Sequence, residues 1–317
     1  MTRKNTTQSY ARAPVKKTLG KRMWEHKELY LLLLPVVVLV FIFAYMPMYG
    51  IMMAFKDFNV RLGVWDSPWV GMENFQALFR SPSFLEVLRN TVLISFYRLL
   101  FGFPAPILFA IFLNEIIHTK FKKVVQTISY LPHFMSWVVL GGIFTQLFSA
   151  DRGIINYLIQ LFGHEPIMFL SDDRYFRSIV IITGIWQSVG WSSVLYLASI
   201  AGIDQQLYEA ARIDGANRFH MMRYITLPSL YPVITILFIL QVGGILNAGF
   251  DQIFNLYSPM VYDVGDILDT YVYRRGIAEG SDYSFTTAVG LFKNVIGFFL
   301  VIVTNKITKK ISDNGIW

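Results

Sequence analysis

Six stretches of this sequence are apolar over about twenty residues, and this repetition limits what the chain can fold into. A helix needs about 20 apolar residues to cross the roughly 30 Å hydrocarbon core of a bilayer. The six stretches lie at about 29–49, 90–114, 124–148, 178–201, 230–250 and 286–305. Only 15% of the 317 residues are charged, whereas soluble domains carry about 25%. The sequence therefore predicts an all-α polytopic membrane protein with six transmembrane helices.

The ends of the chain are polar. Residues 1–28 contain eight Lys and Arg residues, as the start of a signal peptide also would. The apolar run at 29–49 is long enough to span, however, and no small-residue cleavage site follows it. We therefore expect 1–28 and 306–317 to be cytoplasmic tails and 29–305 to be the membrane domain.

The distribution of Lys and Arg predicts the orientation. If the N-terminus is inside, the inner segments are 1–28, 115–123, 202–229 and 306–317, and the outer segments are 50–89, 149–177 and 251–285. The inner segments contain 17 of the 28 Lys and Arg residues and the longer outer segments contain 9. This is the positive-inside pattern, so both termini should be cytoplasmic. The net charge of +7 therefore reflects membrane orientation, and no nucleic-acid partner is expected.

Only two charged residues, Arg98 and Lys293, lie well inside the predicted spans. Proton-coupled carriers usually place carboxylates or histidines there, so the absence of Asp and Glu argues against proton coupling, while Na⁺ coupling through backbone carbonyls stays open. Each buried cation costs about 3 kcal/mol on insertion scales, so both should face protein or a wet cavity. Two interpretations remain: structural pairing, or contact with an anionic group of a substrate.

No pattern typical of an enzyme or a metal site is present. The chain has no cysteine, which excludes disulfides and thiol catalysis. The five histidines have no zinc-binding spacing, and neither GxSxG nor a phosphate-binding loop occurs. The histidines are His26, His118, His133, His164 and His220. We expect no catalytic residues, no metal and no cofactor bound by this chain, so the chain cannot hydrolyse ATP itself and the energy for any active transport must come from elsewhere.

Polar and aromatic side chains mix in the fourth and fifth predicted spans. Gln187 and Trp191 share a helix face with Gly184, and Gln241 shares one with Gly244. Such residues serve helix packing or line a polar path, and rings beside amides suit sugars. The candidate residues for the path are Gly184, Trp186, Gln187, Ser188, Trp191, Gln241, Gly244 and Asn247.

The outer segments also contain patterns that predict their structure or their contacts. Segment 50–89 combines turn residues with an amphipathic pattern, which predicts short interfacial helices. Segment 251–285 is acidic, and it is either a solvated loop or a contact for an external partner.

The polar stretch 204–228 separates the fourth and fifth spans. Asp204 is a good N-cap for a helix from Gln205, and Gly215 can end that helix in a left-handed conformation. A second helix is expected from about Asn217 to Ile225, stopping before Leu227-Pro228. Two short helices at an angle would form a rigid projection, whereas the alternative is an amphipathic helix on the lipid headgroups.

Several residues of this stretch resemble the EAA loop of ABC importer permeases. They are Glu209, Ala210, Ala211, Asp214, Gly215, Leu227 and Pro228. The fuller pattern EAARIDGA…LP resembles the carbohydrate branch of that family. LPVVVLVFIFAYMPMYGIMMAFKDF, NTVLISFYRLLFGFPAPILFAIFLNE, YLPHFMSWVV and the terminal GIW resemble permeases for complex oligosaccharides, of the LplB/YteP and alginate-importer type, so the resemblance covers nearly the whole chain.

The resemblance implies a type I ABC importer permease with the MetI-like fold, in a bacterial cytoplasmic membrane. It implies a second homologous permease as heterodimer partner, two ATPase subunits that use ATP and Mg, and an extracytoplasmic solute-binding lipoprotein that delivers an oligosaccharide. Glu209 would meet basic residues in an ATPase cleft, and Gly215 would allow the turn. In maltose-type permeases the spans equivalent to the fourth and fifth hold the sugar, near Gly184, Gln187, Ser188, Trp191, Gln241 and Gly244. Arg98 and Lys293 lie in motifs that resemble those of such permeases, which favours structural pairing for both.

Two other classes of protein are the alternatives. An ion-coupled secondary carrier or channel would work without an ATPase, and a membrane-embedded enzyme would need a nucleophile or metal cluster. The EAA pattern favours the importer, in which this chain is not the enzyme.

Overall fold

The computed structural model describes residues 20, 24–280 and 282–312 of a chain that divides into two units, 1–52 and 53–317. Its regular structure, within those residues, is helical apart from one isolated bridge between Lys56 and Trp69. Five helices are long and apolar enough to cross a membrane: Lys27–Phe55, Pro82–Asn114, Asp173–Ala201, Arg218–Gly243 and Tyr283–Lys310. The predicted all-α fold is confirmed.

The described part of the first unit is mainly one helix. It begins with α2 (Lys27–Val40), widens into a π turn (Phe41–Tyr45) and continues as a 3-10 segment (Met46–Phe55) into the second unit. This helix has the most apolar window of the five candidate spans, with a mean hydropathy of 2.7. The predicted first span, 29–49, lies in this helix, whereas most of the predicted tail 1–28 lies outside the described residues.

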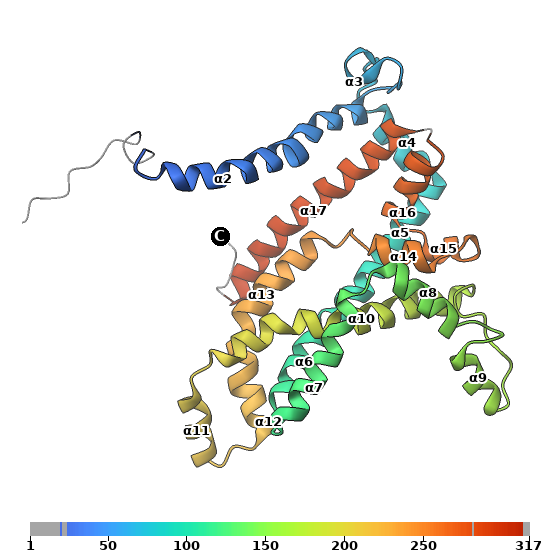
Figure 1. Ribbon diagram of the computed structural model, residues 1–317. Helices are drawn as coiled ribbons and strands as arrows, with labels where there is room; N and C mark the ends of the chain where they lie inside the picture. Colours follow the sequence, from blue (N-terminus) through green and yellow to red (C-terminus); the bar gives the residue numbers. More distant parts are fainter. Residues whose placement is uncertain (1–19, 21–23, 281, 313–317) are drawn as a thin grey trace, which may run out of the picture. The chain divides into compact units, whose positions relative to one another are not determined.

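The second unit joins long and short helices (Figure 1). The longer ones are α5 (Pro82–Tyr97), α6 (Pro104–Asn114), α7 (Thr119–Tyr130), α8 (Trp137–Leu147), α10 (Asp173–Ala201), α13 (Leu227–Gly243) and α17 (Tyr283–Ser312). The shorter ones are α3 (Gly63–Asp66), α4 (Glu73–Arg80), α9 (Ile154–Leu161), α11 (Gln205–Ile213), α12 (Arg218–Met221), α14 (Phe250–Leu256), α15 (Tyr262–Gly265) and α16 (Leu268–Val272). The short helices in segment 50–89 agree with the pattern there.

Three prolines in long helices each follow a π turn. A proline lacks the N–H that would donate four residues back, and its ring collides with that carbonyl. Here the residue before each proline donates to the carbonyl five residues back, in the pairs Met46 to Phe41, Phe103 to Arg98 and Leu227 to Met222. The wider turn shifts the hydrogen-bond ladder ahead of Pro47, Pro104 and Pro228, and the helix continues.

The prediction that a helix stops before Leu227-Pro228 is therefore wrong. α12, the π turn Met222–Thr226 and α13 form one continuous helix, Arg218–Gly243. The stretch 204–228 is thus one separate short helix, α11, followed by the first turns of the long helix that contains the fifth span. Asn217 caps that span, because its side chain accepts a hydrogen bond from the His220 N–H at 2.9 Å.

The predicted third span, 124–148, is not one straight helix. The helix Thr119–Phe134 and α8 meet at an angle of 104°. Pro132 lies in the short 3-10 turn that ends the first part. Ser136 has extended backbone and caps α8, its hydroxyl accepting from the Val139 N–H at 3.4 Å. A proline followed by a strong N-cap starts a new helix in a new direction, which span length alone does not predict.

Three clusters of buried apolar side chains stabilise the second unit. One joins α5, α8, α10 and α14, and contains Phe176, Val180 and Ile253. Another joins α6, α10 and α13 around Tyr196. The last joins α4, α5, α16 and α17. Because α10 contributes to two of them, it runs through the middle of this unit (Figure 1).

Hydrogen bonds between distant segments follow the predicted alternation of sides. Arg218 donates to the Glu115 carbonyl at 3.5 Å, and both residues belong to segments predicted to be inside. Arg177 donates to the Val264 carbonyl at 3.0 Å, and the Phe58 N–H donates to Ser284 at 2.8 Å. Those four residues belong to segments predicted to be outside. The alternation is consistent with these contacts, and which side is cytoplasmic stays a prediction.

Substitution of Asn90 would test which hydrogen bonds join the helix ends near the predicted outer segments. Its side chain is fully buried, accepts from Arg177 at 2.8 Å and donates to the Asp263 carbonyl at 3.0 Å, so it joins α5, α10 and α15. Asn90→Ala leaves a guanidinium and a carbonyl without these partners, and we expect a loss of about 2 kcal/mol. The melting temperature of the purified protein should fall, whereas that of Ser83→Ala, at an exposed site on α5, should not change. Equal melting temperatures for both variants would contradict this role.

Candidate functional site

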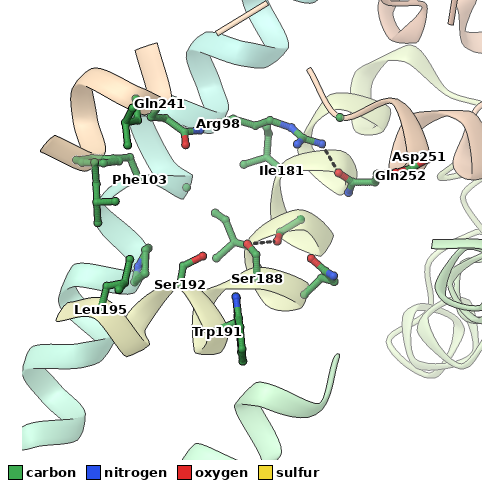
Figure 2. Close-up of a pocket in the computed structure, with 18 of the residues that line it drawn as sticks. Arg98, Phe103, Ile181, Ser188, Trp191, Ser192, Leu195, Gln241, Asp251 and Gln252 are labelled. Atoms are coloured by element: carbon green, nitrogen blue, oxygen red, sulfur yellow. Dashed lines mark hydrogen bonds between the residues drawn. The ribbon is translucent and has the colours of Figure 1, made fainter. Parts of the chain in front are cut away.

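A cavity of about 740 Å³ lies in the second unit between α10, α13 and the middle of the α5–α6 helix. Its walls carry polar and aromatic groups together (Figure 2). They include Arg98, Phe103, Trp137, Gly184, Gln187, Ser188, Trp191, Ser192, Gln241, Asp251 and Gln252. A space of this size, with rings and a few polar groups, is typical of a ligand-binding site.

The aromatic side of the cavity is held in place by stacking. The Trp191 ring lies parallel to the His133 ring, with centroids 4.9 Å apart and an interplanar angle of 5°. The Gln187 amide donates to the His133 carbonyl at 3.5 Å, and the Ser188 hydroxyl is engaged by the Gly184 carbonyl at 2.7 Å. The indole face is thus oriented by the bend between α7 and α8.

The polar side of the cavity is organised by Gln252, which is only 2% exposed. Its amide nitrogen donates to the Val180 carbonyl at 2.7 Å and to the Thr183 hydroxyl at 2.8 Å. Both N–H groups are therefore used, and its oxygen accepts from the Arg98 guanidinium (Figure 2). Gln252 joins α14 to α10 and orients Arg98 at the edge of the cavity.

Gly249 makes room for this arrangement. Its φ of +89° lies in the left-handed region, which glycine adopts at no steric cost. A Cβ at this position would collide with the Arg98 guanidinium. The non-helical segment between α13 and α14 therefore places its backbone directly against the Arg98 guanidinium.

Lys293 has a different environment. Its ammonium group donates to the Asp269 carboxylate, which belongs to α16. This pairing supports the structural interpretation of Lys293. None of the ion pairs that the structure describes includes Arg98, so the two intramembrane cations are not equivalent.

The predicted path residues are brought together only in part. Gly184, Gln187, Ser188, Trp191 and Gln241 line the cavity. Gly244 and Asn247 line a smaller pocket of about 40 Å³ that shares Arg98 and Gln241 with it. Trp186 lies elsewhere, half exposed and edge-on to Phe144 at 5.6 Å.

The sequence pattern does not identify Asp251 and Gln252 as cavity residues, because they follow the fifth apolar run, where the pattern predicts an outer loop. The break at 244–249 returns the chain to the cavity instead. The only signal in the sequence is the glycine-rich end of that run, with Gly243, Gly244 and Gly249 before the Asp-Gln pair.

Three carboxylates of the acidic segment 251–285 form ion pairs within the chain. Asp266 pairs with Arg274, Asp282 pairs with Arg275 at 3.0 Å, and Asp269 pairs with Lys293. Burial alone would lower the pKa of Arg274, but the hydrogen bonds and charge of Asp266 outweigh burial and raise that pKa above its ordinary value. These contacts join α16 and the following turn to α17, so this part of the segment is not a freely solvated loop.

The helix α11 is closed at both ends by its own residues. The Asp204 carboxylate accepts from the Gln206 N–H at 3.0 Å, as expected for an N-cap. Gly215 has φ +83°, the Ala216 N–H donates to the Ala211 carbonyl at 2.8 Å, and the Gly215 N–H donates to the Arg212 carbonyl at 3.1 Å. This is a Schellman C-terminus, which requires the left-handed residue. α11 is therefore a short helix with fixed ends.

One face of α11 is anchored and the other is exposed. The Tyr208 hydroxyl bonds the Thr226 hydroxyl at 2.8 Å, and Thr226 is buried in the helix that becomes the fifth span. On the other side, Leu207 is 51% and Ile213 86% exposed. Glu209 is exposed and forms none of the ion pairs seen among the described residues.

The predicted coupling residues divide between two elements. Glu209, Ala210 and Ala211 lie on α11, and Asp214 and Gly215 form its C-terminal turn. Leu227 and Pro228 lie in the fifth-span helix, where Leu227 packs against the cluster around Tyr196. Figure 1 shows α11 projecting from one end of the second unit.

Comparison with known proteins gives the family. Residues 102–313 match the family described as "Binding-protein-dependent transport system inner membrane component". Protein LplB of Bacillus subtilis (strain 168) is 45% identical over 92% of this chain and 91% of that protein. The polygalacturonan/rhamnogalacturonan transport system permease protein YteP of the same strain is 43% identical over 95% of this chain and 94% of its own length.

Solved structures agree. A chain in the crystal structure of a bacterial ABC transporter involved in the import of the acidic polysaccharide alginate has a TM-score of 0.86 and 39% identity, over 93% of this chain and 99% of that one. A structure of a bacterial alginate ABC transporter in complex with alginate pentasaccharide-bound periplasmic protein gives 0.86 and 38%, over 94% and 99%.

The chain therefore belongs to the family of binding-protein-dependent transport system inner membrane components. It is a multi-pass membrane protein and an ABC importer permease, so the resemblance and the MetI-like fold expected from the sequence are confirmed.

The hydrogen bonds of Gln252 give a prediction for the cavity wall. Gln252→Leu removes the acceptor of Arg98 and the donors to Val180 and Thr183, all in a buried place. We expect a loss of about 3 kcal/mol, seen as a lower melting temperature. Gln241→Leu makes the same change at a cavity residue whose side chain has no hydrogen bond among the described residues, and it should melt like the parent. A similar melting temperature for both variants would show that Gln252 does not organise the wall.

Proposed function

We propose that this chain is the permease subunit through which an ATP-driven importer moves oligosaccharides across a bacterial cytoplasmic membrane by alternating access. In this proposal a second, homologous permease completes a heterodimer. Two separate ATPase subunits bind and hydrolyse Mg-ATP, and an extracytoplasmic lipoprotein delivers the sugar. Both termini and α11 lie on the cytoplasmic side, as the distribution of Lys and Arg predicts.

The observation that carries the proposal is the position of α11 between two cavity-lining helices. Residues 202–204 connect it directly to α10, and the Tyr208–Thr226 hydrogen bond connects it to the helix that continues as α13. α10 and α13 both line the cavity. A movement imposed on α11 from outside is therefore transmitted to two walls of the cavity, as a permease driven by separate motor subunits requires.

The nature of the surface of α11 supports an ATPase as its partner. Leu207 and Ile213 present exposed apolar area, and the Glu209 carboxylate beside them has no ion-pair partner within the described chain. Two alanines on the same short helix allow close approach of another surface. A cleft on an ATPase would pair its basic residues with Glu209 and cover the apolar side chains of Leu207 and Ile213.

The cavity supports a sugar as the cargo. An indole face fixed at Trp191 can stack on the C–H face of a pyranose, and amides at Gln187 and Gln241 can bond its hydroxyls. The named relatives point the same way, because YteP is named for polygalacturonan and rhamnogalacturonan, and the similar solved transporters import alginate. The alginate transporter was solved with a periplasmic protein, which supports delivery by such a partner.

Glu209→Lys tests the docking of the ATPase. Reversal of this charge should reduce both co-purification of the ATPase subunits and sugar uptake at least about tenfold, because a like charge would face the basic cleft. Binding of sugar by the isolated receptor protein should not change. Glu165→Lys, the same charge reversal at an exposed site in a predicted outer segment, should keep both activities. If Glu209→Lys retains the ATPases and full uptake, α11 is not the docking element.

Tyr208→Phe tests the transmission step separately. It removes only the hydroxyl that joins α11 to Thr226, a bond of about 1 kcal/mol. We expect ATPase subunits to stay bound while the sugar imported per ATP hydrolysed falls by roughly two- to tenfold. Tyr224→Phe removes a hydroxyl on the exposed face of the same region and should leave that ratio unchanged. An unchanged ratio in Tyr208→Phe would exclude the hydrogen bond from coupling.

A further inference from the structure

Arg98 lies at the cavity with a charge that the described chain does not neutralise. Its acceptor there, Gln252, is a neutral amide. Its Nε atom is buried and has no hydrogen-bond partner among the described residues. Three other cations, Lys293, Arg274 and Arg275, each pair with an aspartate.

The surroundings fix the orientation of the guanidinium at the cavity wall. Gln252 is anchored by two hydrogen bonds, and the missing Cβ of Gly249 leaves space for the guanidinium against the backbone. Figure 2 shows the Arg98 side chain extending along the cavity wall to Gln252, opposite Ser188 and Trp191. Such a second layer of contacts is typical of a binding group kept in one orientation.

We propose that Arg98 binds a carboxylate of the cargo, so that the cavity selects anionic oligosaccharides, of the uronic acid type, over neutral ones. This inference rests on the proposed function. A planar guanidinium matches a carboxylate through parallel N–H···O bonds, and a carboxylate supplies the countercharge that Gln252 lacks. A neutral sugar offers hydroxyl acceptors only, and it leaves the buried charge uncompensated.

Asp251 places a negative charge on the wall of the same cavity. Its carboxylate lines the wall next to Gln252 and forms none of the ion pairs seen among the described residues. It repels a second carboxylate and can accept hydrogen bonds from sugar hydroxyls. An anionic sugar is therefore expected to place its carboxylate toward Arg98 and its hydroxyls toward Asp251, which gives the bound chain a direction.

The test uses the complete transporter, with both permeases, the ATPases and the binding protein, in liposomes. The probes are a galacturonate trisaccharide, its methyl ester, and maltotriose, which is neutral. We expect uptake of the acid by the parent protein and a loss of at least about tenfold in Arg98→Gln, with uptake of the ester changed by less than about twofold. Arg98→Lys keeps the charge without the fork and should have an intermediate rate.

Two further variants separate this role from a structural one. Gln252→Glu keeps the size of the side chain but gives Arg98 an internal carboxylate, so it should also lower uptake of the acid relative to the ester. Lys293→Gln removes the other intramembrane cation, and it should leave the ratio of acid to ester uptake unchanged. Size-exclusion chromatography of each complex shows that it has assembled.

The outcomes are distinct. Equal loss of acid and ester uptake in assembled Arg98→Gln, or no loss of either, overturns the inference and leaves the proposed function intact. Uptake of maltotriose or the ester alone by the parent also overturns it. Uptake of none of the three probes by the parent overturns the proposed function as well.

Discussion

The hydrocarbon core of a bilayer offers no hydrogen-bond partner to a backbone N–H or C=O group, and the structure follows from that constraint. The predicted spans are mainly helical, and short stretches of irregular backbone interrupt two of them, at 135–136 and at 244–249. At the break after α13, the Asn247 N–H bonds the Gly244 carbonyl at 2.8 Å, while Leu246 and Ala248 are buried. At three prolines a π turn keeps the ladder continuous. Deviations from regular helix thus mark places with a specific local cause.

The same constraint explains why a movement at α11 would reach the cavity. Long helices with saturated backbones behave as stiff elements, and α10 packs in two of the three apolar clusters. It begins among the predicted outer segments, lines the cavity in its middle and ends three residues before α11. Force applied at α11 therefore acts on one rigid element with the cavity along its length. A flexible loop at 202–217 could not act in this way, and the caps at Asp204 and Gly215 prevent it from being one.

The sequence predicts the features that depend on residues close together in the chain. The N-cap at Asp204 and the left-handed residue at Gly215 follow from local chemistry, and the structure shows both of them. The continuation of the helix through Pro228 was not predicted, because a proline has the same local signature whether a helix ends or is carried on by a π turn. For the cavity, helix-face spacing identified Gln187 and Trp191 correctly as wall residues but not Gln252. Its place depends on how the chain returns after Gly249, which is a tertiary property.

Arg98 and Lys293 show the limit most clearly. In the sequence both are single cations in apolar runs, and insertion cost treats them alike. The structure separates them by what lies opposite: an aspartate from α16 for Lys293, an anchored neutral amide for Arg98. The first arrangement satisfies the charge within the chain and serves packing. The second keeps a guanidinium oriented at a cavity while leaving its charge without a countercharge among the described ion pairs. A buried cation without a countercharge therefore says more about the ligand than the aromatic groups around it do, because stacking accepts any sugar whereas a charge accepts few.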